Sequence, residues 1–265
     1  MPNASYTILF LGDVVGEPGR NAVRDRLPRL QDLHQPLFTI VNGENAAGGV
    51  GITPKLADFL LAQNVDALTL GNHAFHKREI LSYLGTSARI VRPINTPATT
   101  PGKGSLTLEK DGILLTVANM CGRVGMEPIY DDPFAAFDRL AAALPSPHLL
   151  LDFHAEATSE KVAMGYHADG RATAVLGTHT HVTTADERVL PGGTAHITDV
   201  GMCGPRNSVL GMDRELILRR FKTGLSEKFE VSNEIGVLSG VVLSVGRDTG
   251  RAQSIQRVSA GNGDA

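Results

Sequence analysis

Five short apolar runs of this 265-residue sequence end in side chains that can bind metal ions. These ends are Gly12-Asp13, Gly43-Glu44-Asn45, Gly71-Asn72-His73, His154-Ala155-Glu156 and Gly177-Thr178-His179-Thr180-His181. Carboxylate, amide and imidazole groups form a mixed oxygen and nitrogen donor set, which suits Mn, Fe, Zn or Co better than Ca or Mg. Because the set holds more donors than one ion needs, the sequence indicates a centre of two metal ions.

The elements that must position these groups are short strands that alternate with helices. The expected strands are Ile8–Leu11, Leu37–Val41, Ala67–Leu70, Ile113–Ala118, Leu149–Phe153 and Thr173–Leu176. The expected helices are Arg20–Leu33, Pro54–Gln63, Lys77–Leu84, Pro133–Ala143 and Thr158–His167. This alternation predicts an α/β fold with largely parallel central strands. Since the carboxyl ends of parallel strands lie along one edge of a sheet, the five polar ends are expected to meet there.

The second half of the sequence is richer in strands. Lys110-Asp111-Gly112 has the composition of a hairpin turn between Leu106–Glu109 and Ile113–Val117. Further strands are expected at His196–Val200 and Gly236–Val245. A mixed sheet, or two packed sheets, is therefore favoured over one purely parallel sheet.

We expect a single domain over residues 1–265, with a frayed tail at 259–265 that has little to bury. A segment near Met212–Leu225 is expected to be a helix and could form an interface between copies of the chain.

Taken singly, each motif is weak evidence, because an Asp after a strand more often serves a turn and Glu44-Asn45 could be a solvated loop. His179-Thr180-His181 is more specific, since alternate residues of an extended chain face the same side. The joint occurrence of all five at strand ends favours a functional site. His76, close to His73, and Asn119, at the end of another strand, are candidate substrate contacts. Cys121 and Cys203 have no CxxC spacing and are expected to be packed thiols.

Composition limits the function classes. The formal net charge is −3, so no general basic field exists to hold a nucleic acid. Two widely spaced cysteines fit a reducing compartment. The sequence has neither a signal-peptide pattern nor a run of about 20 apolar residues, so we expect a cytoplasmic protein without a membrane partner.

The order of these motifs resembles the calcineurin-like metallophosphoesterases and, among them, the YmdB-like family. The segments that carry the resemblance are Gly12-Asp13-Val14-Val15-Gly16, Asn42-Gly43-Glu44-Asn45, Gly71-Asn72-His73, Asp152-Phe153-His154-Ala155-Glu156 and Asp199-Val200-Gly201-Met202-Cys203-Gly204-Pro205. Val15 stands where the broad superfamily has a histidine, and Glu44 stands where it has an aspartate. Both departures are features of the YmdB-like branch.

The resemblance implies a sandwich of two mixed β-sheets flanked by helices, an α/β fold. It also implies one metal site made by Asp13, Glu44, Asn45 and His181, and a second made by Glu44, Asn72, His154 and His179. Glu44 would bridge the two ions. His73 would face the substrate as a general acid or as a stabiliser of the transition state.

The function that follows is hydrolysis of phosphodiesters by a hydroxide bridging two ions, with Fe or Mn favoured and Zn or Co as alternatives. The resemblance implies cyclic nucleotides, particularly 2′,3′-cyclic nucleotides, as substrates, and RNA ends are further candidates. Aromatic residues make up only 5% of the chain, which favours a shallow, permissive pocket. One rival is a phosphomonoesterase, either a protein phosphatase or a nucleotidase, on the same metals. Another is a regulatory protein that binds nucleotide or RNA and uses the metals structurally.

Overall fold

The computed structural model describes residues 4–144 and 146–261, which form two packed β-sheets between helices. In the first sheet the strand order is β2-β12-β13-β1-β3-β4-β5, with β14 paired to β13. Its strands are β1 Ser5–Leu11, β2 Asp13–Val14, β3 Phe38–Asn42, β4 Ala67–Thr69, β5 Ile90–Val91, β12 Met202–Pro205, β13 Gly236–Gly246 and β14 Ala252–Ala260. Strands β1, β3, β4 and β5 are parallel, whereas β13 and β14 are antiparallel to their neighbours.

The second sheet has the order β10-β11-β9-β8-β7-β6. Its strands are β6 Ser105–Lys110, β7 Ile113–Cys121, β8 Leu149–His154, β9 Ala174–Thr178, β10 Arg188–Val189 and β11 Ala195–Ile197. Strands β7, β8, β9 and β11 are parallel, and β6 and β10 close the edges as antiparallel strands. Two mixed sheets confirm the predicted fold class.

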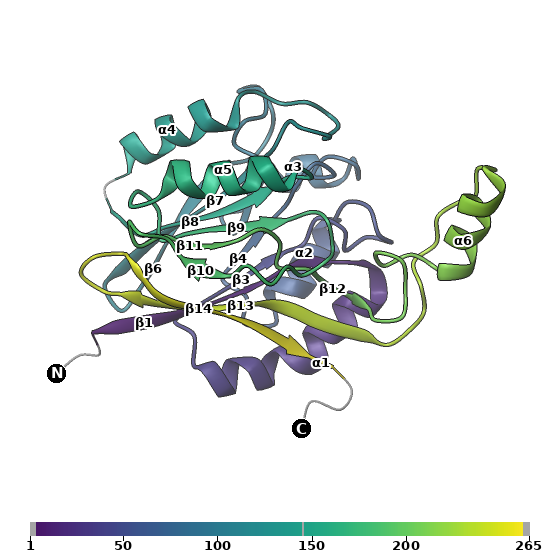
Figure 1. Ribbon diagram of the computed structural model, residues 1–265, viewed down its shortest axis with the longest axis horizontal. Helices are drawn as coiled ribbons and strands as arrows, with labels where there is room; N and C mark the ends of the chain where they lie inside the picture. Colours follow the sequence, from purple (N-terminus) through teal and green to yellow (C-terminus); the bar gives the residue numbers. More distant parts are fainter. Residues whose placement is uncertain (1–3, 145, 262–265) are drawn as a thin grey trace.

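The helices lie outside the two sheets. They are α1 Gly16–His34, α2 Pro54–Leu61, α3 Ile80–Thr86, α4 Pro133–Ala143, α5 Thr158–Ala168 and α6 Arg214–Thr223. Figure 1 shows α4 and α5 over the second sheet, α1 against the first sheet, and α6 standing away from both.

Strand β1 shows why the apolar runs are continuous. Ile8 and Phe10 pack in the core between the two sheets, while Leu9 and Leu11 pack in the core beneath the helices. A strand that is buried on both faces has no solvent-facing positions and therefore reads as an unbroken apolar run.

Local signals at turns and helix starts are confirmed. The Thr53 side chain accepts a hydrogen bond from the Leu56 backbone, and Asp132 accepts from Phe134. Asp111 and Gly112 both have positive φ, of 47° and 75°, which matches the twist of a two-residue hairpin between β6 and β7.

Two expected boundaries were wrong. Helix α3 begins at Ile80 rather than Lys77, because residues 72–79 form turns that carry Asn72 and His73. The tail expected to fray from Ser259 is ordered as far as Ala260, since β14 pairs with β13 and Leu238 lies opposite Ala260. Residues 262–265 of that tail lie outside the described residues.

The helix expected near Met212–Leu225 is α6, capped by the side chain of Asp213. Phe221 on this helix is 79% exposed. Its use as an interface between copies stays a prediction. In the part of the chain that the structure describes, no helix has the length and apolar character to cross a membrane.

Close backbone contact at Gly12 should be essential to the first sheet. A Cβ at this position would lie 1.9 Å from the carbonyl oxygen of Gly201, next to the pairing of β2 with β12. We expect Gly12→Ala to lower the free energy of unfolding by about 1–3 kcal/mol or more. Calorimetry would show this as a fall in Tm of roughly 2–4 °C per kcal/mol.

Gly85→Ala is the matched control, because an added Cβ there would meet no described atom within 4 Å and alanine favours helices. It should leave the Tm unchanged or raise it. A Gly12→Ala protein with the parent's Tm would contradict the assigned contact.

Candidate metal centre

The polar ends of strands from both sheets gather at one place. Glu44 follows β3, Asn72 follows β4, His154 is the last residue of β8, and His179 directly follows β9. Asp13 lies two positions beyond the end of β1 and is the first residue of β2. The ends of parallel strands in two facing sheets therefore supply this cluster, and not the rim of a single sheet.

Glu44 is at the centre of the cluster and is fully buried. Its Oε1 atom lies 3.2 Å from Nε2 of His154 and 3.2 Å from Nδ1 of His73, and accepts a hydrogen bond from Asn45 at 3.0 Å. Its Oε2 atom accepts from the backbone N–H of His73 at 3.2 Å. Donor atoms of Glu44, His154 and His179 all lie within 4.8 Å of one another, close enough to bind one ion.

Asp13 joins the cluster from β2. Its Oδ2 atom accepts the backbone N–H of His179 at 3.1 Å, and its Oδ1 atom lies 3.7 Å from Nδ1 of His154. Among the described residues, Oδ1 has no hydrogen-bond partner although it is buried. Burial raises the pKa of Asp13. An unpaired buried carboxylate oxygen is costly in a folded protein unless a cation or proton neutralises it.

Three histidines turn one ring nitrogen toward the cluster because the other nitrogen is occupied. Nδ1 of His154 donates to the Thr178 hydroxyl at 2.8 Å, since that hydroxyl itself donates to Asp152 at 2.6 Å. Nε2 of His179 lies 3.3 Å from a Glu156 oxygen. Nδ1 of His181 donates to the backbone carbonyl of Leu210 at 2.9 Å. Partners of this kind fix the tautomer and aim the free lone pair at a metal site.

The atoms that face inward repel one another in the absence of a positive charge. Nε2 of His154 lies 3.1 Å from Nδ1 of His179 and 3.0 Å from Oδ1 of Asn72. The Asn72 amide is held in this orientation because its Nδ2 donates to the carbonyl of Glu127 at 3.0 Å. Lone pairs that converge in this way fit a bound cation.

Gly71 keeps the space for such an ion open. A Cβ at Gly71 would lie 2.2 Å from Oε2 of Glu44 and 2.5 Å from Nε2 of His154. The residues present therefore fit a metal centre in both donor type and available space.

Asn45 is oriented differently from Asn72. Its Nδ2 faces Glu44 at 3.0 Å and Nε2 of His181 at 3.2 Å, while its oxygen accepts from Nδ1 of His73 at 3.0 Å. The amide NH₂ thus supplies the positive partial charge between two acceptors. To act as a metal ligand, Asn45 would have to turn its amide over.

The charges of the cluster shift the pKa values of its members. Burial disfavours the charged form of His154, but the Glu44, Asp13 and Asp152 carboxylates outweigh it and raise the pKa of His154 to about 9. Burial opposes ionisation of Glu44 as well, yet His154 and His73 hold the pKa of Glu44 well below its usual value. Burial and the nearby His154 lower the pKa of His179 to about 3. A proton on His154 thus occupies the place of a cation.

The motifs gave no role to two buried residues that lie behind the expected ligands. Asn42 accepts from the Glu44 backbone at 3.0 Å and donates to Asp152 at 2.8 Å, and both side chains are fully buried. Burial raises the pKa of Asp152 to about 7. Asp152 lies two positions before His154 in the same strand, so period-two alternation was a usable signal for this residue.

The other expected residues lie around the cluster. His73 is partly exposed, with a side-chain exposure of 35%. His76 is exposed, and its ring centroid lies 6.3 Å from that of His73. Asn119 is fully buried, and its amide donates to the backbone carbonyl of Asp152 at 3.3 Å. A substrate contact by either His76 or Asn119 stays a prediction.

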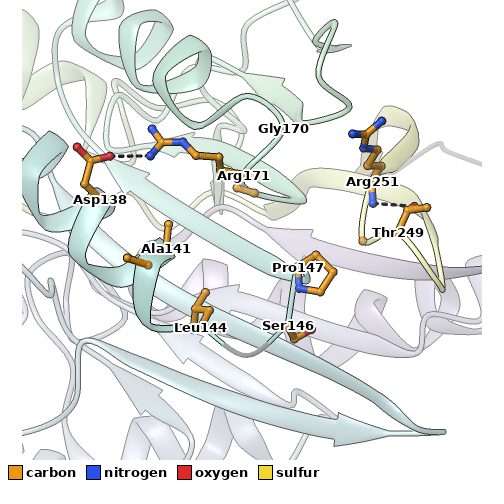
Figure 2. A pocket seen from close by; sticks show the side chains of 12 residues that line it. Asp138, Ala141, Leu144, Ser146, Pro147, Gly170, Arg171, Thr249 and Arg251 are labelled. Atoms are coloured by element: carbon orange, nitrogen blue, oxygen red, sulfur yellow. Dashed lines mark hydrogen bonds and ion pairs between the residues drawn. The ribbon is translucent and has the colours of Figure 1, made fainter.

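A separate cavity of about 500 Å³ lies beside α4 and is shown in Figure 2. Asp138, Arg171, Thr249 and Arg251 are on its wall, and Arg171 is paired with Asp138 at 2.7 Å. Of the described residues that line it, none is an expected metal ligand. We therefore do not assign the chemistry to this cavity.

Two mixed sheets between helices, with carboxylate, asparagine and histidine side chains at their strand ends, define a protein of the metallophosphoesterase class. A family model described as "YmdB-like protein" matches residues 9–258, and the chain belongs to this family. It is 51% identical over 253 residues to the 2′,3′-cyclic-nucleotide 2′-phosphodiesterase of Bacillus subtilis strain 168, a match that covers 95% of this chain and 96% of that protein.

Solved structures agree with this family. A hypothetical protein from Thermus thermophilus superimposes with a TM-score of 0.90 at 42% identity, covering 96% of this chain and 98% of that one. A structure described as a novel phosphatase, from Mycoplasma pneumoniae, gives a TM-score of 0.92 at 36% identity, with coverage of 97% and 93%. The family resemblance read from the motifs is confirmed.

Metal binding should compete with the proton on His154. Because the pKa of His154 is about 9 in the metal-free fold, an ion can reach Nε2 only when that proton leaves. We expect the apparent affinity for Mn²⁺ to rise about tenfold per pH unit from pH 6.5 toward pH 9. Titration calorimetry of metal-depleted protein, in buffers with different ionisation enthalpies, measures both the affinity and the released proton.

Rising pH should favour Mn²⁺ binding but lower the free energy of unfolding of the metal-depleted protein, because both depend on the proton of His154. The pKa of His154 is about 9 in the folded chain and 6.5 ordinarily, so protonated His154 stabilises the metal-depleted fold. This contribution is complete below about pH 6.5 and is lost as the pH rises through about 9. An affinity for Mn²⁺ that stays constant from pH 6.5 to pH 9 would contradict the competition between the metal ion and the proton on His154.

Proposed function

We propose that this chain is a metal-dependent phosphodiesterase whose substrates are cyclic nucleotides, with 2′,3′-cyclic nucleotides favoured. The observation that carries the proposal is the convergence of imidazole, amide and carboxylate side chains around the buried Glu44. The B. subtilis relative, which is named for hydrolysis of 2′,3′-cyclic nucleotides, supports the substrate class.

The proposed ligands fall into two sets that share Glu44. One set is Asp13, Glu44, Asn45 and His181, and the other is Glu44, Asn72, His154 and His179. Support comes from the contacts between side chains, because Asn45 reaches His181 while Asn72 reaches His154. We favour Fe or Mn as the metal, since the donor set mixes oxygen with nitrogen.

When bound, two cations would supply the charge that attracts a phosphate and would make water a nucleophile near neutral pH. The chain itself must bind those ions, hold the substrate and donate a proton to the leaving oxygen. The buried carboxylates of Asp13 and Glu44 provide the negative charge that the first task needs.

His73 is the proposed acid or transition-state stabiliser. Nδ1 of His73 faces two acceptors, Oδ1 of Asn45 at 3.0 Å and Oε1 of Glu44 at 3.2 Å, so it carries a hydrogen. Nε2 is left for the substrate, on a side chain that is partly exposed. A histidine in this position can stabilise or protonate the oxygen that leaves when the phosphodiester is cleaved.

A phosphomonoesterase on the same centre is the second candidate. The structural relative from M. pneumoniae is described as a phosphatase, and a curated relative from that organism, 38% identical, as a putative phosphatase/phosphodiesterase. RNA ends carry the same phosphodiester chemistry and remain proposed substrates. An assembly of several copies remains part of the proposal as well.

The proposed function is tested by metal content and substrate preference together. The protein should be purified without added metal, measured for elemental content, and supplied with Mn²⁺ or Fe²⁺. Turnover of bis-p-nitrophenyl phosphate and 2′,3′-cyclic AMP should then exceed that of p-nitrophenyl phosphate. Faster turnover of the monoester would favour the phosphomonoesterase. Bound metal with no turnover of any of the three would favour a regulatory binding protein.

His73→Ala should separate catalysis from metal binding. We expect kcat for the diester to fall about 10²–10⁴-fold while the metal content stays near that of the parent, because His73 is proposed to act on substrate and not as a ligand. Steady-state kinetics and elemental analysis provide the two readouts. His34→Ala, at the far end of α1, is the matched control and should change neither. A His73→Ala protein that has lost its metal would disprove the separation of roles.

A further inference from the structure

A lysine in α5 is buried beside the proposed metal centre. Lys161 is 0% exposed, and its Nζ lies 2.7 Å from Oδ2 of Asp199, which is also fully buried. Removing two charges from water is expensive, and a buried ion pair is seldom a net gain over apolar packing. Stability alone therefore gives no reason for this pair.

Asp199 uses its carboxylate to hold backbone N–H groups. Oδ2 accepts from Thr180 at 3.0 Å as well as from Lys161, and Oδ1 accepts from Gly201 at 2.8 Å. The Asp199 backbone is held in turn, since its N–H donates to the Thr184 hydroxyl at 2.9 Å. The contact with Lys161 thus restrains the orientation of the Asp199 carboxylate that accepts from Thr180.

Thr180 lies between two proposed ligands that have an unfavourable backbone conformation. His179 has a φ of 102° and His181 a φ of 65°, in the region that side-chain-bearing residues rarely adopt. Each such residue costs on the order of 1–3 kcal/mol and persists only where its surroundings enforce it. The enforcing contacts are the N–H of His179 to Asp13 and the N–H of Thr180 to Asp199.

The segment that begins at Asp199 also holds Asp13. Met202 and Cys203 pair with Asp13 and Val14 as β12 beside β2. Gly201, with a φ of 80°, packs so closely that a Cβ would lie 2.1 Å from the Thr183 hydroxyl. One stretch of chain, part of a motif to which the sequence analysis gave no role, thus contacts both the Asp13 strand and the two-histidine loop.

We propose that Lys161 and Asp199 are positioning residues that hold His179 and His181 in ligand geometry and so set the metal affinity of the centre. The inference rests on the proposed function, because it concerns the same ligands. Lys161 orients Asp199, Asp199 holds the N–H between the two histidines, and neither residue touches substrate.

The test compares metal affinity with the stability of the metal-depleted protein. In Lys161→Met the Asp199 carboxylate loses its countercharge, and we expect the Kd for Mn²⁺ to rise about 10–100-fold, the usual cost of losing a group that orients a ligand. Titration calorimetry gives the Kd, and thermal unfolding of the metal-depleted protein gives the structural cost. Tyr6→Phe is the matched control, because it removes a buried hydrogen bond to His148 and should keep the parent's Kd.

A second variant covers the case in which Lys161→Met does not fold. Lys161→Met combined with Asp199→Asn is close in volume to the parent pair and leaves no buried charge. Without lysine, either atom of the new amide can face Thr180, so the Kd should again rise. A folded variant of either kind with the parent's Kd for Mn²⁺ would overturn the inference, whatever its Tm.

The outcomes for this inference and for the proposed function are distinguishable. A parent protein that takes up no metal under any condition would refute the proposed function, and this inference with it. A parent that binds Mn²⁺, together with variants that bind it equally well, would refute only the positioning role of Lys161 and Asp199.

Discussion

The constraint on which this structure depends is the enforced proximity of buried acceptor groups that need a proton or a cation between them. His154 and His179 direct ring nitrogens at each other across 3.1 Å, beside a buried Glu44 and a buried Asp13. Buried polar atoms normally find partners, and buried charges are paired or bind metal. Without a metal ion, the carboxylates of Glu44, Asp13 and Asp152 raise the pKa of His154 to about 9 and so favour a proton at this position. The rest of the fold acts as a framework that keeps these buried side chains from moving apart.

That framework works through the period of β-strands. Asp152 and His154 lie two positions apart in β8 and face the same side of that strand, and Asn42 is the last residue of β3, two positions before Glu44. The side chains of Asn42 and Asp152 bond to each other at 2.8 Å and connect the first sheet to the second. Asp152 also supports His154 through the Thr178 hydroxyl. Because buried hydrogen bonds join the proposed ligands of one sheet to those of the other, the packing of the two sheets also sets the geometry of the cluster.

Structural features that depend on one short segment of chain could be predicted from the sequence. The apolar runs gave the strands, Thr53 and Asp132 marked helix starts, and Asp111-Gly112 marked the hairpin. Strand β14 was missed because it is mostly exposed and has few large apolar residues. The start of α3 was misplaced because Asn72 and His73 require turns where helical periodicity begins. Partners such as Lys161 and Asp199 are 38 positions apart, and Asn42 and Asp152 are 110 apart, so periodicity cannot pair them.

Asp152 and Asp199 are both buried carboxylates that hold residues of the cluster by hydrogen bonds, but they restrain different parts of the chain. Asp152 lies behind His154, a residue of regular strand, and only has to fix a ring tautomer through Thr178. Asp199 supports a loop whose histidines have positive φ, so it must restrain the backbone itself and uses N–H groups to do so. To restrain a backbone N–H, the accepting carboxylate must keep one orientation. The buried ion pair with Lys161 holds the Asp199 carboxylate in that orientation. This difference explains why a buried lysine lies behind the two-histidine loop, while neutral Asn42 and Thr178 suffice behind His154.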